Sequence, residues 1–420
     1  MSETRRPHSA GALSARPEVE DLVAYSAPLE GRRGLLRLDF NENTVGPSPQ
    51  VVEAIRAIPA DHYAIYPEYD GLREAVISAL VTEAAAGPEA LIPAHIGLFN
   101  GVDAALHAVF QAYGAQGDRL LTTSPTFGYY TPCARMQGMT IEAIPYRMPD
   151  FVFPLEEIRA ALLGPGGAGE ASSDWHPPRL LLICNPNNPT GTRLAPERIL
   201  ELAAAAPRTL VVVDELYEAF TGDSVLPLLL NAPAASPGGG NGVGADPFAA
   251  HPNLLVLRSL AKTAGLAGLR IGFAIGAQAL VDRVGRVTGP YDINSFAVTA
   301  ARAALADQAY TDAYVAEVLR AREWLLEQLQ ASGVRYHAAG GNYLLIWPSW
   351  PAAQVEAELR KAGILVRSMA GKPLIDGALR VSLGTSEQMG RFWRSFCKVE
   401  QIDLRSDDQA IVTDRPENVG

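Results

Sequence analysis

Residues 180–214 read LLLICNPNNPTGTRLAPERILELAAAAPRTLVVVD, and this stretch decides the fold class. Two apolar runs, Leu180 to Cys184 and Leu210 to Val213, enclose the segment from Ala195 to Ala206, in which apolar residues recur at helical spacing. Pro196 suits the first turn of that helix. A strand, a helix and a second strand in this order form a βαβ unit, so the sequence predicts an α/β protein with a parallel sheet.

The same pattern continues on both sides of this unit and then changes near residue 291. A third buried strand is expected from Leu254 to Leu257, and an amphipathic helix from Gly101 to Tyr113. The C-terminal part predicts long helices and short strands, which is typical of a smaller α+β domain. Its expected helices are Ala301 to Gln330, Ala352 to Ala362 and Ser386 to Lys398, and its expected strands are Tyr343 to Trp347, Ile364 to Arg367 and Leu379 to Leu383.

The predicted organisation has four parts. Residues 1–37 form an N-terminal arm, 38–290 a large domain, 291–400 a small domain and 401–420 a polar tail. The first ~25 residues of the large domain are candidates for joining the small one. Two segments, 164–178 and 231–252, are rich in Gly, Ala, Pro and Ser, and we expect them to be surface insertions because they offer little apolar surface to bury.

Composition excludes several classes of protein. A net charge of −11 and a pI near 5.2 argue against a nucleic-acid partner, since phosphate backbones select basic faces. No stretch reaches the roughly 18 apolar residues of a membrane span, and the N-terminal sequence lacks the apolar block of a secretory signal, so we expect no membrane partner and a cytoplasmic location. The three cysteines are far apart, which predicts neither a disulfide framework nor a metal site.

The string VLRSLAKTAGLAGLRIG, residues 256–272, holds the most specific chemical signal. Lys262 follows a buried strand and precedes a glycine-rich turn. Burial lowers the pKa of an amine, and the neutral amine is nucleophilic enough to form an imine. Ser259 and Arg270 flank the lysine at distances at which a hydroxyl and a guanidinium can meet a phosphate. Outside such a string, a lysine after a strand is usually a surface residue.

Two further strings place polar side chains at strand ends. CNPNNPTG, residues 184–191, presents amide side chains at the carboxyl edge of the sheet, where open α/β folds bind ligands, although an Asn-Pro pair also simply turns the chain. In VVVDELY, residues 211–217, Asp214 ends a hydrophobic strand, where a carboxylate is costly unless a cation meets it. A protonated pyridine nitrogen is such a cation, and a helix cap is the alternative interpretation.

These strings occur together with six others in a fixed order between Leu38 and Thr385: DFNENTVGPSP (39–49), YPE (66–68), NGVD (100–103), PTFGYY (125–130), GILVR (363–367) and LRVSLGT (379–385). The set resembles the fold-type-I aminotransferases that depend on pyridoxal 5'-phosphate (PLP), and within them the histidinol-phosphate aminotransferase branch. The resemblance implies a large domain with a mixed, mostly parallel seven-stranded sheet flanked by helices, a smaller α+β domain, and a transaminase with PLP as its cofactor.

Position by position, the resemblance implies roles for the following residues. Lys262 would carry PLP as a Schiff base and later move a proton, and Asp214 would pair with the pyridine nitrogen. Asn188 and Tyr217 would hydrogen-bond the phenolic oxygen of the ring. The remaining cofactor contacts implied are Phe127 on the ring, and Val102, Asp103, Ser259 and Arg270 on the phosphate, with Tyr66 lent to the phosphate of a neighbouring subunit in a homodimer with shared sites. A helix cap for Asp103 and core packing for Phe127 remain alternatives.

On the substrate side, Arg380 matches the arginine that binds a substrate carboxylate or phosphate, and Arg367, Tyr25 and Asn43 are the other candidate substrate contacts. Two departures from the family pattern stand out. Ala261 replaces the usual Ser or Thr before the lysine, which removes one hydroxyl from the phosphate site and weakens cofactor retention by about 1 kcal/mol. Thr44 stands where enzymes of the histidine pathway commonly have Pro.

The leading hypothesis is a transaminase that moves the amino group of histidinol phosphate to 2-oxoglutarate by a ping-pong cycle, in histidine biosynthesis. The alternatives are an aromatic or broad-specificity amino-acid aminotransferase, and a PLP-dependent decarboxylase for a phosphorylated amino acid. From another class, an effector-sensing domain of a transcription regulator is disfavoured, because only about 37 residues precede the first family motif and they contain no basic recognition helix.

Overall fold

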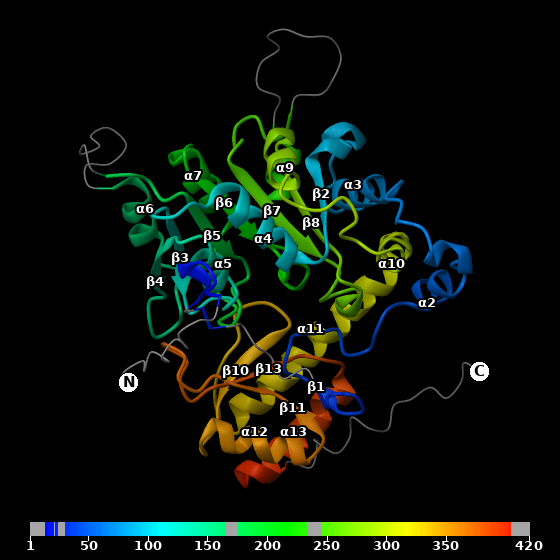
Figure 1. Ribbon diagram of the computed structural model, residues 1–420. Helices are drawn as coiled ribbons and strands as arrows, with labels where there is room; N and C mark the ends of the chain where they lie inside the picture. Colours follow the sequence, from blue (N-terminus) through cyan, green and yellow to red (C-terminus); the bar gives the residue numbers. More distant parts are fainter. Residues whose placement is uncertain (1–12, 21, 24–29, 165–174, 233–245, 405–420) are drawn as a thin grey trace.

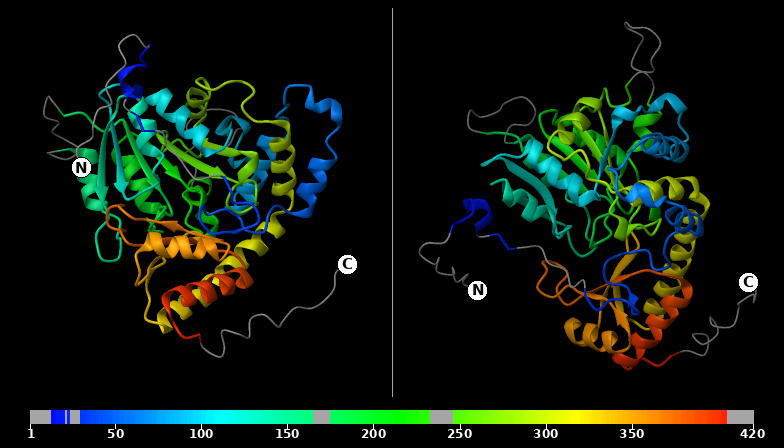
Figure 2. Two further views of the ribbon diagram at one scale, coloured as in Figure 1. Left: turned by 60° about the horizontal axis from the view of Figure 1, so that its bottom comes forward. Right: turned by 45° about the vertical axis from the view of Figure 1, so that its right-hand side comes forward.

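The computed structural model describes residues 13–20, 22–23, 30–164, 175–232 and 246–404. Its elements fall into two groups, an upper one around a large sheet and a lower one around a small sheet (Figure 1). The long helix α11, Gln308–Ala331, runs from the upper group to the lower one. The two groups also stay distinct in both views of Figure 2, and they meet along one boundary.

The large sheet has seven strands in the order β2-β8-β7-β6-β5-β3-β4. Neighbours from β7 to β4 pair in parallel, while β8 is antiparallel to both β2 and β7. The predicted mixed, mostly parallel seven-stranded sheet is therefore confirmed. Its strands are β2 Ile96–Phe99, β3 Arg119–Ser124, β4 Thr140–Pro145, β5 Leu180–Cys184, β6 Leu210–Asp214, β7 Leu254–Ser259 and β8 Gly272–Gly276.

Helices cover this sheet and close one large hydrophobic core with it. Every residue of β5 and β6 is buried, as the continuous apolar runs in the sequence predict for central parallel strands. The helices of this group are α2 Pro49–Arg56, α3 Leu72–Glu83, α4 Val102–Tyr113, α5 Tyr130–Met136, α6 Leu155–Leu163, α7 Pro196–Ala205, α8 Leu226–Leu230, α9 Gln278–Gly285 and α10 Ser295–Ala306, with α1 Pro17–Glu20 lying against α5. Short 3-10 helices occupy Ala60–Tyr63, Pro88–Ala90, Pro93–His95, Glu218–Phe220 and Ala267–Leu269.

The lower group has a four-stranded antiparallel sheet in the order β12-β13-β10-β9, packed against helices in a second hydrophobic core. The elements are β9 Arg335–His337, β10 Tyr343–Trp347, β12 Arg367–Ser368, β13 Leu379–Ser382, α12 Ala352–Lys361 and α13 Ser386–Glu400. A separate parallel pair joins β1, Leu36–Arg37, to β11, Ile364–Leu365. Leu36 and Leu38 lie in this second core, so the chain enters the lower group before it crosses to α2.

Three expectations about local structure need correction. The single helix expected from Ala301 to Gln330 is two helices, because Asp307 leaves the helical conformation between α10 and α11. The strand expected from Ile364 to Arg367 is divided, since β11 pairs with β1 while β12 pairs with β13. The segment 231–252 is not wholly a surface insertion, because the described Phe248 is fully buried in the large core. Most of 164–178 and 231–252 lies outside the described residues, as does the tail beyond residue 404.

Candidate active site

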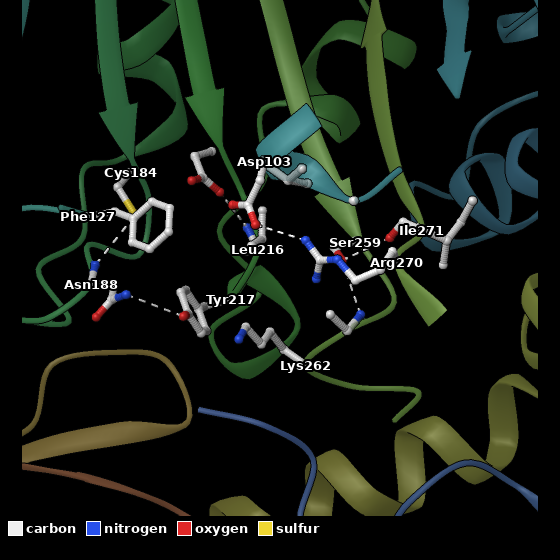
Figure 3. Close-up of a pocket in the computed structure, with 14 residues that line it drawn as sticks. Asp103, Phe127, Cys184, Asn188, Leu216, Tyr217, Ser259, Lys262, Arg270 and Ile271 are labelled. Carbon is white, nitrogen blue, oxygen red and sulfur yellow. Dashed lines mark hydrogen bonds and ion pairs between the residues drawn. The ribbon is translucent and has the colours of Figure 1, made fainter. Parts of the chain in front are cut away.

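One cavity lies at the carboxyl ends of β5, β6 and β7, where the three parallel strands end side by side. It contains about 600 Å³ of free space and is partly open to solvent. Figure 3 shows side chains from several segments converging on it. The lining residues are Gly101, Val102, Asp103, Phe127, Cys184, Asn188, Asp214, Leu216, Tyr217, Ser259, Ala261, Lys262, Arg270 and Ile271. All of the predicted cofactor contacts except Tyr66 are among them.

Lys262 lies three residues beyond the end of β7, on the wall of this cavity. The surrounding protein removes water from the ammonium group, and this desolvation, together with the charges of Arg380 and Arg270, lowers the pKa of Lys262 to about 8. Its Nζ donates a hydrogen bond to the backbone oxygen of Phe40 at 3.0 Å. A substantial fraction of the amine is therefore neutral near physiological pH, as a nucleophile requires.

Asp214 is the last residue of β6 and its side chain is almost completely buried. Burial raises its pKa from 3.8 to about 6, although two hydrogen bonds oppose that change. The hydroxyl of Tyr130 donates to Oδ2 at 2.6 Å, and the backbone N–H of Leu216 donates to Oδ1 at 3.3 Å. Within the described part of the chain, no Lys or Arg side chain forms an ion pair with Asp214, so this cavity presents a buried carboxylate without a cationic partner.

Tyr130 is a site residue that the sequence argument missed. The sequence predicted no role for Tyr130, yet its side chain is fully buried and its hydroxyl contacts the Asp214 carboxylate. The two residues are 84 positions apart and meet because α5 packs beside the sheet edge. The position of Tyr130 within the PTFGYY string was the only available signal.

A chain of polar contacts runs along the opposite wall of the cavity. Asn188 Nδ2 lies 3.5 Å from the Tyr217 hydroxyl, and Asn41 Nδ2 donates to the same hydroxyl at 3.1 Å. Arg380 Nη1, from β13, donates to Asn188 Oδ1 at 2.7 Å. Burial raises the pKa of Tyr217, so its hydroxyl stays protonated and can donate to an acceptor in the cavity. The contacts place the guanidinium of Arg380 next to the predicted cofactor contacts.

The remaining wall is suited to an anion. Helix α4 begins at Val102, and no side chain caps its N-terminus. Because this N-terminus lines the cavity, the first N–H groups of the helix are available to an anion there. Asp103 therefore does not cap the helix; its carboxylate pairs instead with Arg270 at 2.8 Å. A Cβ at Gly101 would lie 2.7 Å from Arg270 Nη2, and Gly101 has φ +78°, so glycine is required there. Arg270 itself has φ +59°, an uncommon conformation for a non-glycine residue that marks a constrained position.

Among the described residues, four predicted ones are not in the cavity lining: Tyr66, Arg367, Asn43 and Arg380, of which Arg380 contacts the lining residue Asn188. Tyr66 is 70% exposed, with its ring stacked on Tyr291 at 4.0 Å between centroids. Arg367 is the cross-strand neighbour of Arg380 and lies over the ring of Phe40, outside the cavity. Tyr25 lies outside the described residues.

Asn43 was expected to contact substrate, but its side chain is buried and bonded to the backbone. Its Nδ2 donates to the Thr263 carbonyl at 2.7 Å, and its Oδ1 accepts from the N–H groups of Val45 and Gly46, both at 2.8 Å. These contacts fold the turn after the Asp39–Glu42 segment and attach it to the residue after Lys262. Short polar side chains that bond to nearby backbone in this way stabilise turns.

The cavity has the features that PLP requires. Asp214 is a buried carboxylate that lacks a cation, and a protonated pyridine nitrogen is a cation of suitable size. The N-terminus of α4, with Ser259 and Arg270 beside it, can bind a phosphate, and Phe127 offers an aromatic face to a ring. Lys262 supplies the amine. Among the described residues, no group of three or more His, Cys, Asp or Glu side chains could hold a metal ion, and no helix is long and apolar enough to cross a membrane.

Comparison with known proteins gives a consistent result. The profile of the aminotransferase class I and II family matches residues 33–396. Histidinol-phosphate aminotransferase 1 of Bordetella parapertussis is 33% identical over 363 residues, which cover 84% of this chain and 89% of that protein. The histidinol-phosphate aminotransferase of Roseiflexus castenholzii is 33% identical over 395 residues, with coverage of 89% and 94%.

Solved structures show the same fold. The crystal structure of histidinol-phosphate aminotransferase from Sinorhizobium meliloti, in complex with pyridoxal-5'-phosphate, superimposes with a TM-score of 0.74 at 23% identity, covering 94% of this chain and 99% of that one. The enzyme from Clostridium acetobutylicum gives a TM-score of 0.70 at 19% identity, covering 87% and 99%. Because the family profile spans most of its length, this chain belongs to the class I and II aminotransferases.

Proposed function

We propose that this aminotransferase transfers the amino group of histidinol phosphate to 2-oxoglutarate, with PLP attached to Lys262. One observation carries the cofactor part of the proposal. A single cavity joins a half-buried amine with a lowered pKa, a buried carboxylate without a cation, and a helix N-terminus beside an arginine. These are the three groups needed for the aldehyde, the ring nitrogen and the phosphate of PLP.

When bound, PLP supplies the aldehyde that takes up the amino group and the protonated ring that withdraws electrons from the substrate. The residues of this chain supply the rest. Asp214 would hold the ring nitrogen in its protonated form, and the Tyr130 hydroxyl fixes the orientation of the Asp214 carboxylate. Asn188 and Tyr217 line the cavity and would hydrogen-bond the phenolic oxygen of the ring. The Lys262 amine, whose pKa is lowered to about 8 in the cofactor-free protein, would accept the proton from the substrate Cα and return it.

Arginine side chains support a substrate with two negative charges. Arg380 and Arg367 are directly opposite each other in the antiparallel pair β12–β13, so their side chains leave the same face of the sheet. Two neighbouring guanidinium groups provide bidentate hydrogen bonds to a phosphate dianion better than one group can. The names of the relatives at about one third identity favour histidinol phosphate as the amino donor over an amino acid.

The homodimer belongs to the same proposal. Four large side chains that are more than half exposed lie in two segments, 63–66 and 291: Tyr63, Ile65, Tyr66 and Tyr291. Such a cluster on a protein surface favours contact with another protein surface. A second copy of the chain covering it would bring Tyr66 to the phosphate of the partner's cofactor. Light scattering should then report twice the chain mass, and Tyr66→Ala should weaken cofactor retention. A monomer with full activity would contradict this part of the proposal. We also propose that the enzyme is cytoplasmic, as its sequence predicts.

The decisive experiment offers a panel of amino donors to the PLP-loaded protein with 2-oxoglutarate and measures glutamate. The proposal expects histidinol phosphate to give the highest kcat/KM, and Arg380→Ala and Arg367→Ala to lower it mainly through KM. A large preference for phenylalanine would replace it by the aromatic aminotransferase alternative. Release of carbon dioxide from a phosphorylated amino acid, without a keto product, would identify a decarboxylase.

A further inference from the structure

The segment Asp39–Glu42, called the clamp loop from here on, contacts three residues of the candidate active site through three consecutive residues. The backbone oxygen of Asp39 accepts from Arg380, and that of Phe40 accepts from Lys262 at 3.0 Å. The side chain of Asn41 donates to the Tyr217 hydroxyl at 3.1 Å. The placement of this loop therefore affects the Lys262 amine, the Tyr217 hydroxyl and the Arg380 guanidinium together.

The loop is held on one side by the small sheet. Asn41 has φ +55°, its N–H donates to Ser382 Oγ at 2.8 Å, and its backbone oxygen accepts from Asn342 Nδ2 at 3.2 Å. Asparagine adopts the left-handed conformation at little cost, but a residue keeps this conformation only where the surrounding contacts enforce it. The small sheet provides one set of contacts, so the loop needs a second.

Arg32 provides the second set. Its Nε and Nη2 donate to both oxygens of Asp39 at 3.0 and 2.7 Å, and its Nη1 and Nη2 donate to both oxygens of Glu42 at 3.1 and 2.9 Å. The guanidinium also lies 4.2 Å from the centroid of the Phe40 ring. Arg32 is only 9% exposed, so these interactions are little screened by water. A single side chain thus binds both ends and the middle of the loop.

We infer that Arg32 is a positioning residue of the transaminase site, which fixes the clamp loop so that Phe40 holds the Lys262 amine and Asn41 holds the Tyr217 hydroxyl. Arg32 precedes the stretch that matches the family profile, which begins at residue 33. The inference rests on the proposed role of Lys262 but not on the identity of the amino donor.

The charges around Lys262 agree with this role. Burial alone would raise the pKa of Glu42, but the hydrogen bonds and charge of Arg32 hold it below its usual value, so Glu42 stays ionised. That carboxylate in turn favours the protonated form of Lys262, while Arg380 and Arg270 disfavour it and Asp103 favours it. Arg32 therefore keeps an anion at a fixed place near the amine, in addition to holding the Phe40 carbonyl.

The test compares Arg32→Met with Arg37→Met. Arg37 contacts the same Glu42 oxygen from outside, through Nε at 3.3 Å, but has no contact with Asp39, and it is a matched control for the loss of one arginine beside Glu42. In the full-length chain without cofactor, trace acetylation with mass spectrometry gives the pH midpoint at which Lys262 becomes reactive. In the PLP-loaded protein, kcat and KM are measured with the best donor.

Arg32→Met should move the Lys262 midpoint by about 0.5 pH units or more and lower kcat by about tenfold or more, because the amine and its acceptor lose their mutual alignment. Arg37→Met should change the midpoint by less than about 0.2 and leave kcat within about twofold. If Arg32→Met only lowers the melting temperature, with the midpoint and kcat of the folded protein unchanged, Arg32 is merely structural and the inference is overturned. An equal effect of Arg37→Met would also overturn it.

A second variant covers the case in which Arg32→Met does not fold. Glu42→Gln keeps the shape and leaves the Arg32–Asp39 pair in place, and it removes one negative charge near the amine. The Lys262 midpoint should fall, and an unchanged or higher midpoint counts against the inference. The labelling needs no substrate, so a different amino donor would leave its result intact. Failure of the wild-type protein to bind PLP at Lys262 would instead contradict the proposed function.

Discussion

Asp214→Asn should stabilise the cofactor-free protein at neutral and alkaline pH while it removes most of the activity. The folded protein raises the pKa of this carboxyl from 3.8 to about 6, chiefly by burial. An acid whose pKa is higher in the folded state contributes stability below its unfolded pKa, and that contribution is lost as the pH rises through the folded pKa. Ionised Asp214 therefore lowers the free energy of unfolding, and asparagine, which has no charge, does not.

The size of this cost follows from the two pKa values. Linkage between 3.8 and about 6 gives a penalty of about 2 kcal/mol at pH 5 and about 3 kcal/mol at pH 8. The group is buried, so solvent does not screen it appreciably. Asparagine can still accept from Tyr130 or Leu216, which limits the loss of hydrogen bonds. The advantage of the variant should therefore grow by about 1 kcal/mol between pH 5 and pH 8.

Urea unfolding of both proteins without cofactor, at several values between pH 5 and pH 8, measures this difference. The same variants loaded with PLP provide the contrast. There the wild-type carboxylate gains a cationic partner, so the advantage of Asn should shrink or reverse, and kcat should fall by orders of magnitude. A stability difference that stays flat from pH 5 to pH 8 would refute the view that Asp214 is a strained carboxylate awaiting a cation.

Three other substitutions test separate parts of the site. Lys262→Ala should abolish the visible absorption of bound PLP and nearly all turnover while leaving the far-UV circular dichroism unchanged; catalysis that persists would exclude Lys262 as the attachment point. Tyr130→Phe removes a hydrogen bond to a charged group, which is worth roughly 1.5–3 kcal/mol. The acid limb of the kcat–pH profile should therefore move to higher pH by about one unit or more. If the limb does not move, Tyr130 does not stabilise the Asp214 carboxylate. Ala261→Ser should restore a hydroxyl to the phosphate wall and lower the Kd for PLP about fivefold, as equilibrium dialysis can measure; a higher Kd would place residue 261 outside that wall.

The parts of the site that the sequence predicted are those set by strand ends. Asp214 and Lys262 follow continuous apolar runs, and parallel strands in register bring such ends to one edge of a sheet. Local patterning was enough for them. It did not reveal the break at Asp307, because the apolar spacing continues on both sides of a residue that ends one helix and precedes the next. Nor did it reveal the contacts of Asn43, whose Nδ2 donates to a backbone oxygen 220 positions away.

Contacts between distant segments explain the remaining misses. Tyr130 reaches Asp214 across 84 positions, and Phe40 reaches Lys262 across 222, so neither pair leaves a periodic trace in the sequence. Both contacts depend on how helices and loops pack against the sheet. The strand division at Val366 has the same origin, since β11 needs the N-terminal strand β1 as its partner. Side-chain identity within a motif identifies candidates, but only tertiary packing decides which of them meet.

The position of the clamp loop gives this distinction a functional meaning. The loop begins immediately after β1 has paired with β11 in the lower group, and its carbonyls meet Lys262 and Arg380, which come from opposite sides of the boundary between the two groups. Arg380 and the loop lie on the same side of that boundary, so a change in the spacing of the two groups would alter the contact with Lys262 and keep the contact with Arg380. Arg32 lies on the lower side with the loop, so its two carboxylate pairs make the loop move with the small sheet instead of remaining with the lysine.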